Sequence, residues 1–252
     1  IATVPDATRA LPPEDVLSIL PPGVDPSRPG KAGREGRRRR PVPPPPTGNE
    51  WLWLQLVRLS GFLGRHAQEG GGLLLHSALA HLPPREGRPG GGVLLAGRSG
   101  VGKSTASRRL PPPWQALCDD ATLVVRDGRG RYLAHPWPTW SRVFAGHLDD
   151  RWDVQSAVPL RAVCVLEQAE ADQLRPARVP EAVSLLMELS RQATHRLWLP
   201  GRVGLDLLRR VHTQRFENAC ALAAAVPADL LDLSLHGPFW TVLEGRIRHD
   251  EL

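Results

Sequence analysis

Residues 97–105 read Gly97-Arg98-Ser99-Gly100-Val101-Gly102-Lys103-Ser104-Thr105. The stretch fits the phosphate-binding pattern G-x-x-x-x-G-K-[S/T], in which glycines let the backbone turn tightly and aim N–H groups at phosphate oxygens. Its flanks agree, because the apolar run 92–96 indicates a buried strand and residues 103–110 indicate a short helix whose N-terminus adds positive potential. The sequence therefore predicts a P-loop, with Lys103 at the terminal phosphates and the Ser104 hydroxyl on Mg²⁺.

The use of lysine supports this prediction. The chain has two lysines, Lys31 and Lys103, against 30 arginines. Composition alone would place an arginine at position 103, so the lysine indicates a site that needs a compact point charge on a flexible stem. All nine loop residues are candidate ATP-binding residues.

Charge and composition argue against a nucleic-acid partner and a membrane partner. The net charge is +6, and the densest basic run is 37–40. No aromatic interleaving or nucleic-acid motif accompanies that run, so we interpret it as a solvated segment and expect no nucleic-acid partner. No run approaches the roughly 20 apolar residues of a membrane span, so we expect no membrane partner either.

The cysteines indicate the compartment. Cys118, Cys164 and Cys220 are far apart, with no C-x-x-C pair and no His-Cys cluster. This spacing argues against a disulfide framework and a structural zinc, and favours a reducing cytoplasm. The length of 252 residues is compatible with one or two domains and a full hydrophobic core.

Composition divides the chain in two. Residues 1–48 are rich in Pro, Gly and Arg and predict a disordered leader, with one short helix over 13–20, because they offer too little apolar surface to offset ordering entropy. Residues 49–252 predict the folded, ATP-binding domain. Within it, residues 51–63 fit a strand or a short helix equally well.

The remaining pattern predicts an α/β fold around a mixed sheet. A strand over 72–79 and the P-loop strand are joined by a loop too short for a crossover helix, so we expect an antiparallel pair. The other expected elements are strands over 121–125, 158–167, 231–235 and 239–243, a turn at 127–130, and helices over 180–198 and 205–225.

Asp119 and Asp120 are the second candidate constellation. They follow a short apolar run 16 residues after Lys103. Phosphoryl transfer uses one carboxylate near Mg²⁺ and often another to accept the proton of the nucleophile, and adjacent side chains at a strand end can divide these roles. We assign Asp119 to the metal and Asp120 to the proton, with the reverse assignment open.

Weaker candidates lie outside these two motifs. His76 is either a core histidine or, from the strand before the P-loop, a contact of the γ-phosphate or of an aspartate of the pair. Residues 135–141, with two tryptophans between prolines, predict a rigid loop or the wall of a pocket. The sequence also leaves open whether Glu167 binds the metal and whether Arg142, Arg161 or Arg202 binds phosphate.

Together, His76, the stretch 97–104 and Cys118-Asp119-Asp120 resemble the catalytic core of HPr kinase/phosphorylase, a family that shares its fold with phosphoenolpyruvate carboxykinase. Residues 158–167 resemble a looser set of HPr-kinase-like proteins of peptide-modification gene clusters, such as the SynChlorMet cassette ScmC proteins and lasso-peptide kinases. The resemblance implies a P-loop kinase core with a mixed sheet, Mg·ATP on the P-loop, an acid/base aspartate in the pair and a serine hydroxyl as acceptor.

The chain also departs from that family. Thr105 stands where HPr kinases usually carry Glu, their Gly-rich second motif is not recognisable, and no N-terminal regulatory domain of normal size is present, so HPr as acceptor and the reverse reaction are not carried over. We expect a cytoplasmic kinase, compatible with a homo-oligomer, that acts on a peptide or protein, with His76, Lys103 and the aspartates as catalytic residues. The alternative is a non-catalytic ATP-binding accessory or scaffold protein of a biosynthetic cassette.

Overall fold

A computed structural model describes residues 48–98, 100–138, 153–194 and 204–249, with side chains from residue 59 to residue 247. The expected leader, the short helix over 13–20 and Ser99 lie outside these residues. The compact unit that carries the strands spans Trp53–Leu252. In chain order the elements are α2 (Gly48–Glu69), β1 (Leu73–Leu75), β2 (Ser77–Leu82), β3 (Gly91–Ala96), α3 (Lys103–Arg109), β4 (Gln115–Cys118), β5 (Ala121–Arg126), β6 (Tyr132–Trp137), β7 (Val158–Gln168), β8 (Gln173–Pro176), α5 (Val179–Thr194), α6 (Leu205–Ala225), β9 (Ala228–Leu233) and α7 (Trp240–His249).

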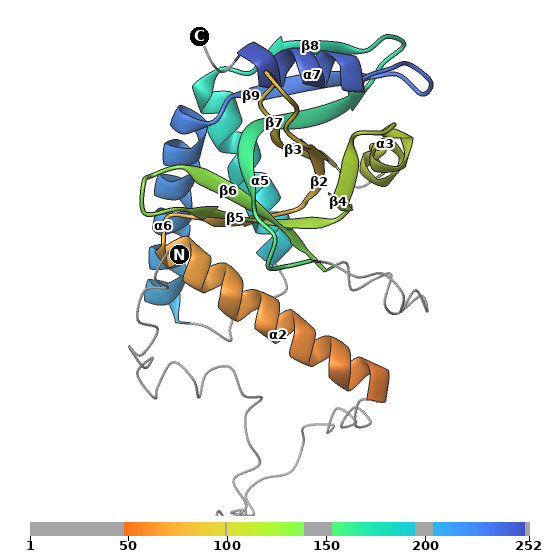
Figure 1. Cartoon of the computed structure of the whole chain (residues 1–252). Coiled ribbons are helices and arrows are strands. Elements are labelled where there is room, and N and C mark those ends of the chain that lie inside the picture. The colour runs from red at the N-terminus through yellow and green to blue at the C-terminus, as the bar shows by residue number, and fades with distance from the viewer. Residues whose placement is uncertain (1–47, 99, 139–152, 195–203, 250–252) are drawn as a thin grey trace, which may run out of the picture. The chain divides into compact units, whose positions relative to one another are not determined.

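The fold is α/β, with a mixed and mostly antiparallel sheet, as Figure 1 shows. The main path of the sheet runs β1-β5-β6-β7-β3-β2-β4, and β9 pairs with both β7 and β8. The parallel pairings join the long central strand β7 to β3 on one side and to β9 on the other. The expected antiparallel pair before the P-loop is confirmed, because Ser77 of β2 lies opposite Ala96 of β3.

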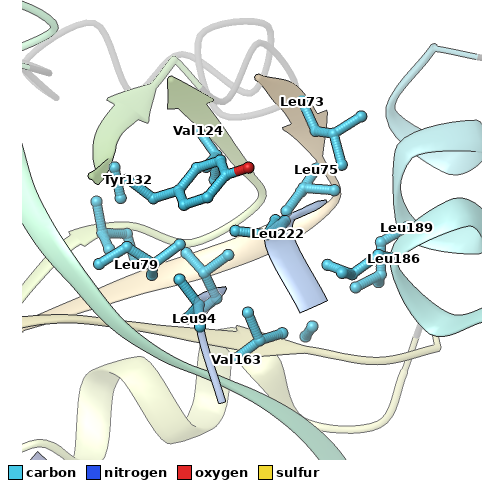
Figure 2. Packing of buried hydrophobic residues seen from close by; sticks show 14 of the residues in the cluster. Leu73, Leu75, Leu79, Leu94, Val124, Tyr132, Val163, Leu186, Leu189 and Leu222 are labelled. Atoms are coloured by element: carbon cyan, nitrogen blue, oxygen red, sulfur yellow. The ribbon is translucent and has the colours of Figure 1, made fainter. Parts of the chain in front are cut away.

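Side chains of β3 alternate between two cores, as the two-residue period of a strand requires. Leu94 belongs to the core that α5 and α6 cover, whereas Val93 and Leu95 belong to the core that α3 and α7 cover. Figure 2 shows the first core, in which Leu186 of α5 and Leu222 of α6 pack with the leucines of the strands. The strand that leads into the P-loop is therefore buried on both faces.

The helix after the P-loop is fixed to the second core at its far end. The guanidinium of Arg109, the last residue of α3, donates to the carbonyl of Ser234 at 2.7 Å. It also lies over the ring of Phe239, 5.1 Å from the centroid. These contacts hold α3 against the segment that precedes α7.

Several expectations are corrected. The expected single strand over 72–79 is two strands, β1 and β2, with His76 between them. β1 pairs with β5, while β2 pairs with β3 and β4. The backbone N–H of His76 leaves the sheet and donates to the carbonyl of Leu189 at 3.1 Å. The apolar segment 72–79 thus forms two strands, because its two halves pair with different neighbouring strands.

The expected strand over 239–243 is wrong, since residues 240–249 form α7. Phe239, Leu243 and Ile247 are all buried, and their four-residue spacing is helical. The expected strand ends at Leu243, so the residues considered for it do not include Ile247, and the four-residue spacing cannot be recognised. The ambiguous segment 51–63 lies within α2, so it is a helix.

The expected loop over 135–141 is wrong in its first half. His135, Pro136 and Trp137 belong to β6, while residues 139–141 lie outside the described part of the chain. β7 pairs with β6 only at Leu133 and Ala134. Pro136 therefore stands where no N–H is needed toward β7, which is how a strand tolerates proline.

Candidate functional site

The P-loop connects β3 to α3, as the sequence predicts. Gly97, Gly100 and Gly102 have φ values of 143°, 82° and 112°, a region that side chains with a Cβ rarely adopt. A Cβ on Gly97 would also approach Val101 Cγ1 to 3.0 Å and the carbonyl oxygen of Leu166 to 3.2 Å. The glycines thus meet a conformational need, and the loop fits the phosphate cradle of its motif.

Lys103 points back into this loop. Its side chain is buried, and Nζ donates to the carbonyl oxygens of Gly97 at 2.9 Å and of Arg98 at 3.2 Å. Burial lowers the pKa of the ammonium, while the charge of Asp120 opposes that shift. The ammonium is therefore held at the start of the loop.

The other expected loop residues differ in exposure. Arg98, Gly100 and Thr105 are exposed, whereas Val101 and Ser104 are half-buried. Ser104 is the second residue of α3, so its hydroxyl lies in the first turn, where the motif uses it for Mg²⁺.

The aspartate pair lies beside the P-loop edge because of the strand register. β2 begins at Ser77, next to the end of β3, and it pairs with β4 on its other side, where Leu79 lies opposite Cys118. Asp119 and Asp120 follow Cys118 directly. The start of one strand and the ends of two others thus meet at one edge of the sheet.

His76 joins this group through a direct contact. Its Nδ1 lies 3.3 Å from Oδ1 of Asp120. The sequence leaves several roles open for His76, and the one that the structure shows is the contact with an aspartate of the pair. Asp119 is half-buried in the same turn.

The three charged or titratable groups influence one another. Burial lowers the pKa of His76 first, the charge of Lys103 lowers it further, and the carboxylate of Asp120 raises it. A neutral imidazole beside Asp120 is therefore favoured near neutral pH. The site combines a cation, a carboxylate and a neutral histidine at the end of β3.

A hollow of about 660 Å³ adjoins the P-loop. That volume is in the range of small-molecule sites. It lies between the P-loop, the end of β7 and α5, and it is lined by Gly97, Arg98, Gly100, Val101, Val165, Leu166, Glu167, Gln168, Leu185, Glu188, Leu189 and Gln192. Sequence reasoning missed the hollow; its one sequence signal is the recurrence of the four α5 residues at steps of three and four, the spacing of one helix face.

Glu167 and Arg161, two of the weaker candidates, bond to other groups of the protein. Oε2 of Glu167 accepts a hydrogen bond from Arg175 at 2.9 Å, and Arg175 also bonds Asp232. Nε of Arg161 donates to the carbonyl of Gly90, at the opposite end of β3 from the P-loop. Arg142 and Arg202 lie outside the described residues.

No group of three or more His, Cys, Asp or Glu side chains that could cage a metal occurs in the part of the chain that the structure describes. Mg²⁺ needs no such cage, because it commonly binds through one or two carboxylates together with substrate phosphates. Ser104 and an aspartate of the pair fit that mode. None of the described helices combines the length and the apolar character needed to cross a membrane.

Comparison with known proteins identifies the family. The model of the SynChlorMet cassette protein ScmC matches residues 45–248. This range contains the P-loop, His76 and the aspartate pair, and it covers most of the chain. The search of curated proteins returns no match. On the strength of the family match, the chain belongs to the ScmC family of SynChlorMet cassette proteins.

Proposed function

We propose that this chain is an ATP-dependent kinase of the HPr-kinase-like type, which transfers the γ-phosphoryl group of ATP to a serine hydroxyl of a peptide or protein. The observation that carries the proposal is the 3.3 Å contact of His76 with Asp120 at the edge where Lys103 closes the P-loop. A phosphate-binding lysine and a carboxylate held by a histidine at one strand edge are the parts that phosphoryl transfer requires.

In this mechanism the loop amides and Lys103 bind the β- and γ-phosphates. Asp120 accepts the proton of the acceptor hydroxyl, whose oxygen forms a bond to the γ-phosphorus as the bond to the β-phosphate oxygen breaks and ADP leaves with the electron pair. His76 orients the carboxylate of Asp120. Ser104 and Asp119 would hold Mg²⁺, which supplies neutralising charge to the phosphates when it is bound.

The family match supports a proposal about the acceptor. The name of the matched family places its members in a gene cassette. We propose that the acceptor is a peptide encoded by the same cassette, and a precursor-peptide gene beside the gene for this chain is the expected observation.

The test separates a kinase from an ATP-binding accessory protein. Calorimetric titration with Mg·ATP is followed by incubation with [γ-³²P]ATP and serine-containing peptides, and Asp120→Asn is the matched variant. The kinase proposal expects ATP binding by both proteins, and radioactive phosphoserine from the wild type only. ATP binding without transfer to any acceptor would favour the accessory role, and absence of ATP binding contradicts both.

A further inference from the structure

We propose that the hollow between the P-loop and α5 receives an apolar side chain of the peptide acceptor, and that Leu185 determines which side chain fits. This inference rests on the proposed kinase function and deepens it.

The hollow lies at the terminal-phosphate end of the loop. In a P-loop the lysine reaches the β- and γ-phosphates. Here Nζ of Lys103 is bonded to the carbonyls of Gly97 and Arg98, and both of these residues line the hollow. An acceptor must approach the γ-phosphorus from the side opposite the leaving ADP. The hollow therefore adjoins the end of the loop at which the γ-phosphate and its acceptor would meet.

The wall of the hollow is also tied to the proposed base. Leu189 lines the hollow, and its carbonyl accepts the backbone N–H of His76 at 3.1 Å. His76 in turn contacts Asp120. A peptide that rests on this part of α5 thus brings its hydroxyl toward the carboxylate that takes the proton.

The apolar part of the lining favours an apolar occupant. The two carboxylates on its wall each have an arginine partner, since Arg175 bonds Glu167 at 2.9 Å and Arg191 bonds Glu188 at 2.7 Å. Val165, Leu166, Leu185 and Leu189 contribute the apolar part of the lining. Arg98 adds an exposed cation on the loop side of the hollow. Away from it, the apolar side chains gain free energy when an apolar residue of the acceptor excludes water from them.

Leu185 is the residue of α5 that can change selectivity without loss of the core. Leu189 is 3% exposed and belongs to the hydrophobic core, so its replacement would destabilise the protein. Leu185 is only partly buried and lines the hollow. A larger side chain at 185 should fill the hollow. Val179, at the start of the same helix, is 55% exposed, lies outside the hollow and offers a matched control.

The test uses a positional-scanning library of short peptides with one central serine, with [γ-³²P]ATP as the donor. Wild type and Val179→Trp should phosphorylate peptides that carry an apolar residue near the serine in preference to the others. Leu185→Trp should lower kcat/KM for those peptides by about tenfold, the scale on which an apolar pocket discriminates. Its Kd for Mg·ATP should stay within about twofold of wild type, because Leu185 belongs to α5 and not to the loop that is proposed to hold the phosphates.

Two results would overturn this inference alone. One is an unchanged peptide preference in Leu185→Trp, with normal ATP binding and transfer. The other is a loss of ATP affinity in Leu185→Trp but not in Val179→Trp, which would assign the hollow to the nucleoside. Failure of the wild type to bind ATP, in contrast, contradicts the proposed function itself.

Discussion

His76 and Asp120 are 44 residues apart in sequence, yet Nδ1 of the histidine lies 3.3 Å from Oδ1 of the aspartate. The contact exists because β2 pairs with β3 and β4 at once, which brings the start of β2 beside the turn that follows β4. The imidazole is 22% exposed and the carboxylate 47%, so Asp120 keeps access to solvent and to an acceptor. The pair therefore couples a half-buried, pH-sensitive group to the proposed catalytic base.

The first prediction concerns stability at acid pH. Burial and the charge of Lys103 lower the pKa of His76 below its unfolded value. The folded state then favours the neutral ring, so this contribution to stability is complete above about pH 6.5 and is lost as pH falls below it. Melting temperatures measured from about pH 7.5 to about pH 5 should fall less steeply in His76→Asn than in wild type.

The control is the same substitution at an exposed histidine of α6, His212→Asn, whose melting temperatures should follow the wild-type acid limb. Parallel acid limbs in wild type and His76→Asn would show that protonation of His76 costs the folded state nothing.

The second prediction concerns the two aspartates. If Asp120 takes the proton, Asp120→Asn should bind Mg·ATP normally and turn over slowly, whereas Asp119→Asn should need more Mg²⁺ for the same rate. Initial rates across a Mg²⁺ titration separate the two variants. If instead Asp120→Asn needs more Mg²⁺ and Asp119→Asn binds Mg·ATP normally but turns over slowly, the two roles are reversed. Near-wild-type phosphorylation by both variants would show that the pair is only a structural turn.

The third prediction concerns the P-loop lysine. Lys103→Met keeps an apolar stem of similar length but removes the charge that the terminal phosphates need. ATP affinity or turnover should fall at least about tenfold, or about 1.4 kcal/mol. Arg108→Ala removes a charge from the exposed side of the same helix and should leave both unchanged. Equal ATP affinity and turnover in Lys103→Met and wild type would refute the assignment of the loop.

Local features of this fold could be predicted from the sequence. The P-loop depends on glycines at fixed spacing, and positive φ values occur at Gly97, Gly100 and Gly102. Helix α6 has the bounds that its spacing predicts. The turn at 127–130 forms because Asp127 accepts backbone hydrogen bonds from Arg129 and Arg131. Each of these elements is decided by residues close together in the chain.

Features set by distant partners could not be predicted. The break at His76 depends on a hydrogen bond to Leu189, more than a hundred residues away. The hollow depends on α5 lying beside the P-loop, and no local pattern gives that position. The adjacency of Asp120 and His76 was one of several alternatives in the sequence, and the register of β2 with two strands decides among them.

The fourth prediction concerns Asn218, which anchors the strand that leads to His76. This residue of α6 is 4% exposed. Its Nδ2 donates to the carbonyls of Gln68 at 2.7 Å and of Gly72 at 2.9 Å, where α2 ends and β1 begins. Asn218→Leu should remove the side-chain donor from both carbonyls. The carbonyl of Gln68 keeps the N–H of Gly71 at 3.2 Å, whereas the buried carbonyl of Gly72 loses the amide that bonds it. An unsatisfied buried polar group costs about 1–3 kcal/mol, so the free energy of unfolding should fall by about 2 kcal/mol or more.

For a domain of this size, that loss lowers Tm by about 4–8 °C. Glu217→Leu, at the exposed neighbouring position, should cost less than about 0.5 kcal/mol, because it removes no buried partner. Asn218 lies away from the P-loop residues in sequence and contact, so Asn218→Leu should keep the Kd for Mg·ATP at temperatures where it remains folded. A Tm equal to that of wild type would mean that the carbonyl of Gly72 finds another donor and that α6 does not hold β1, and with it His76, in place.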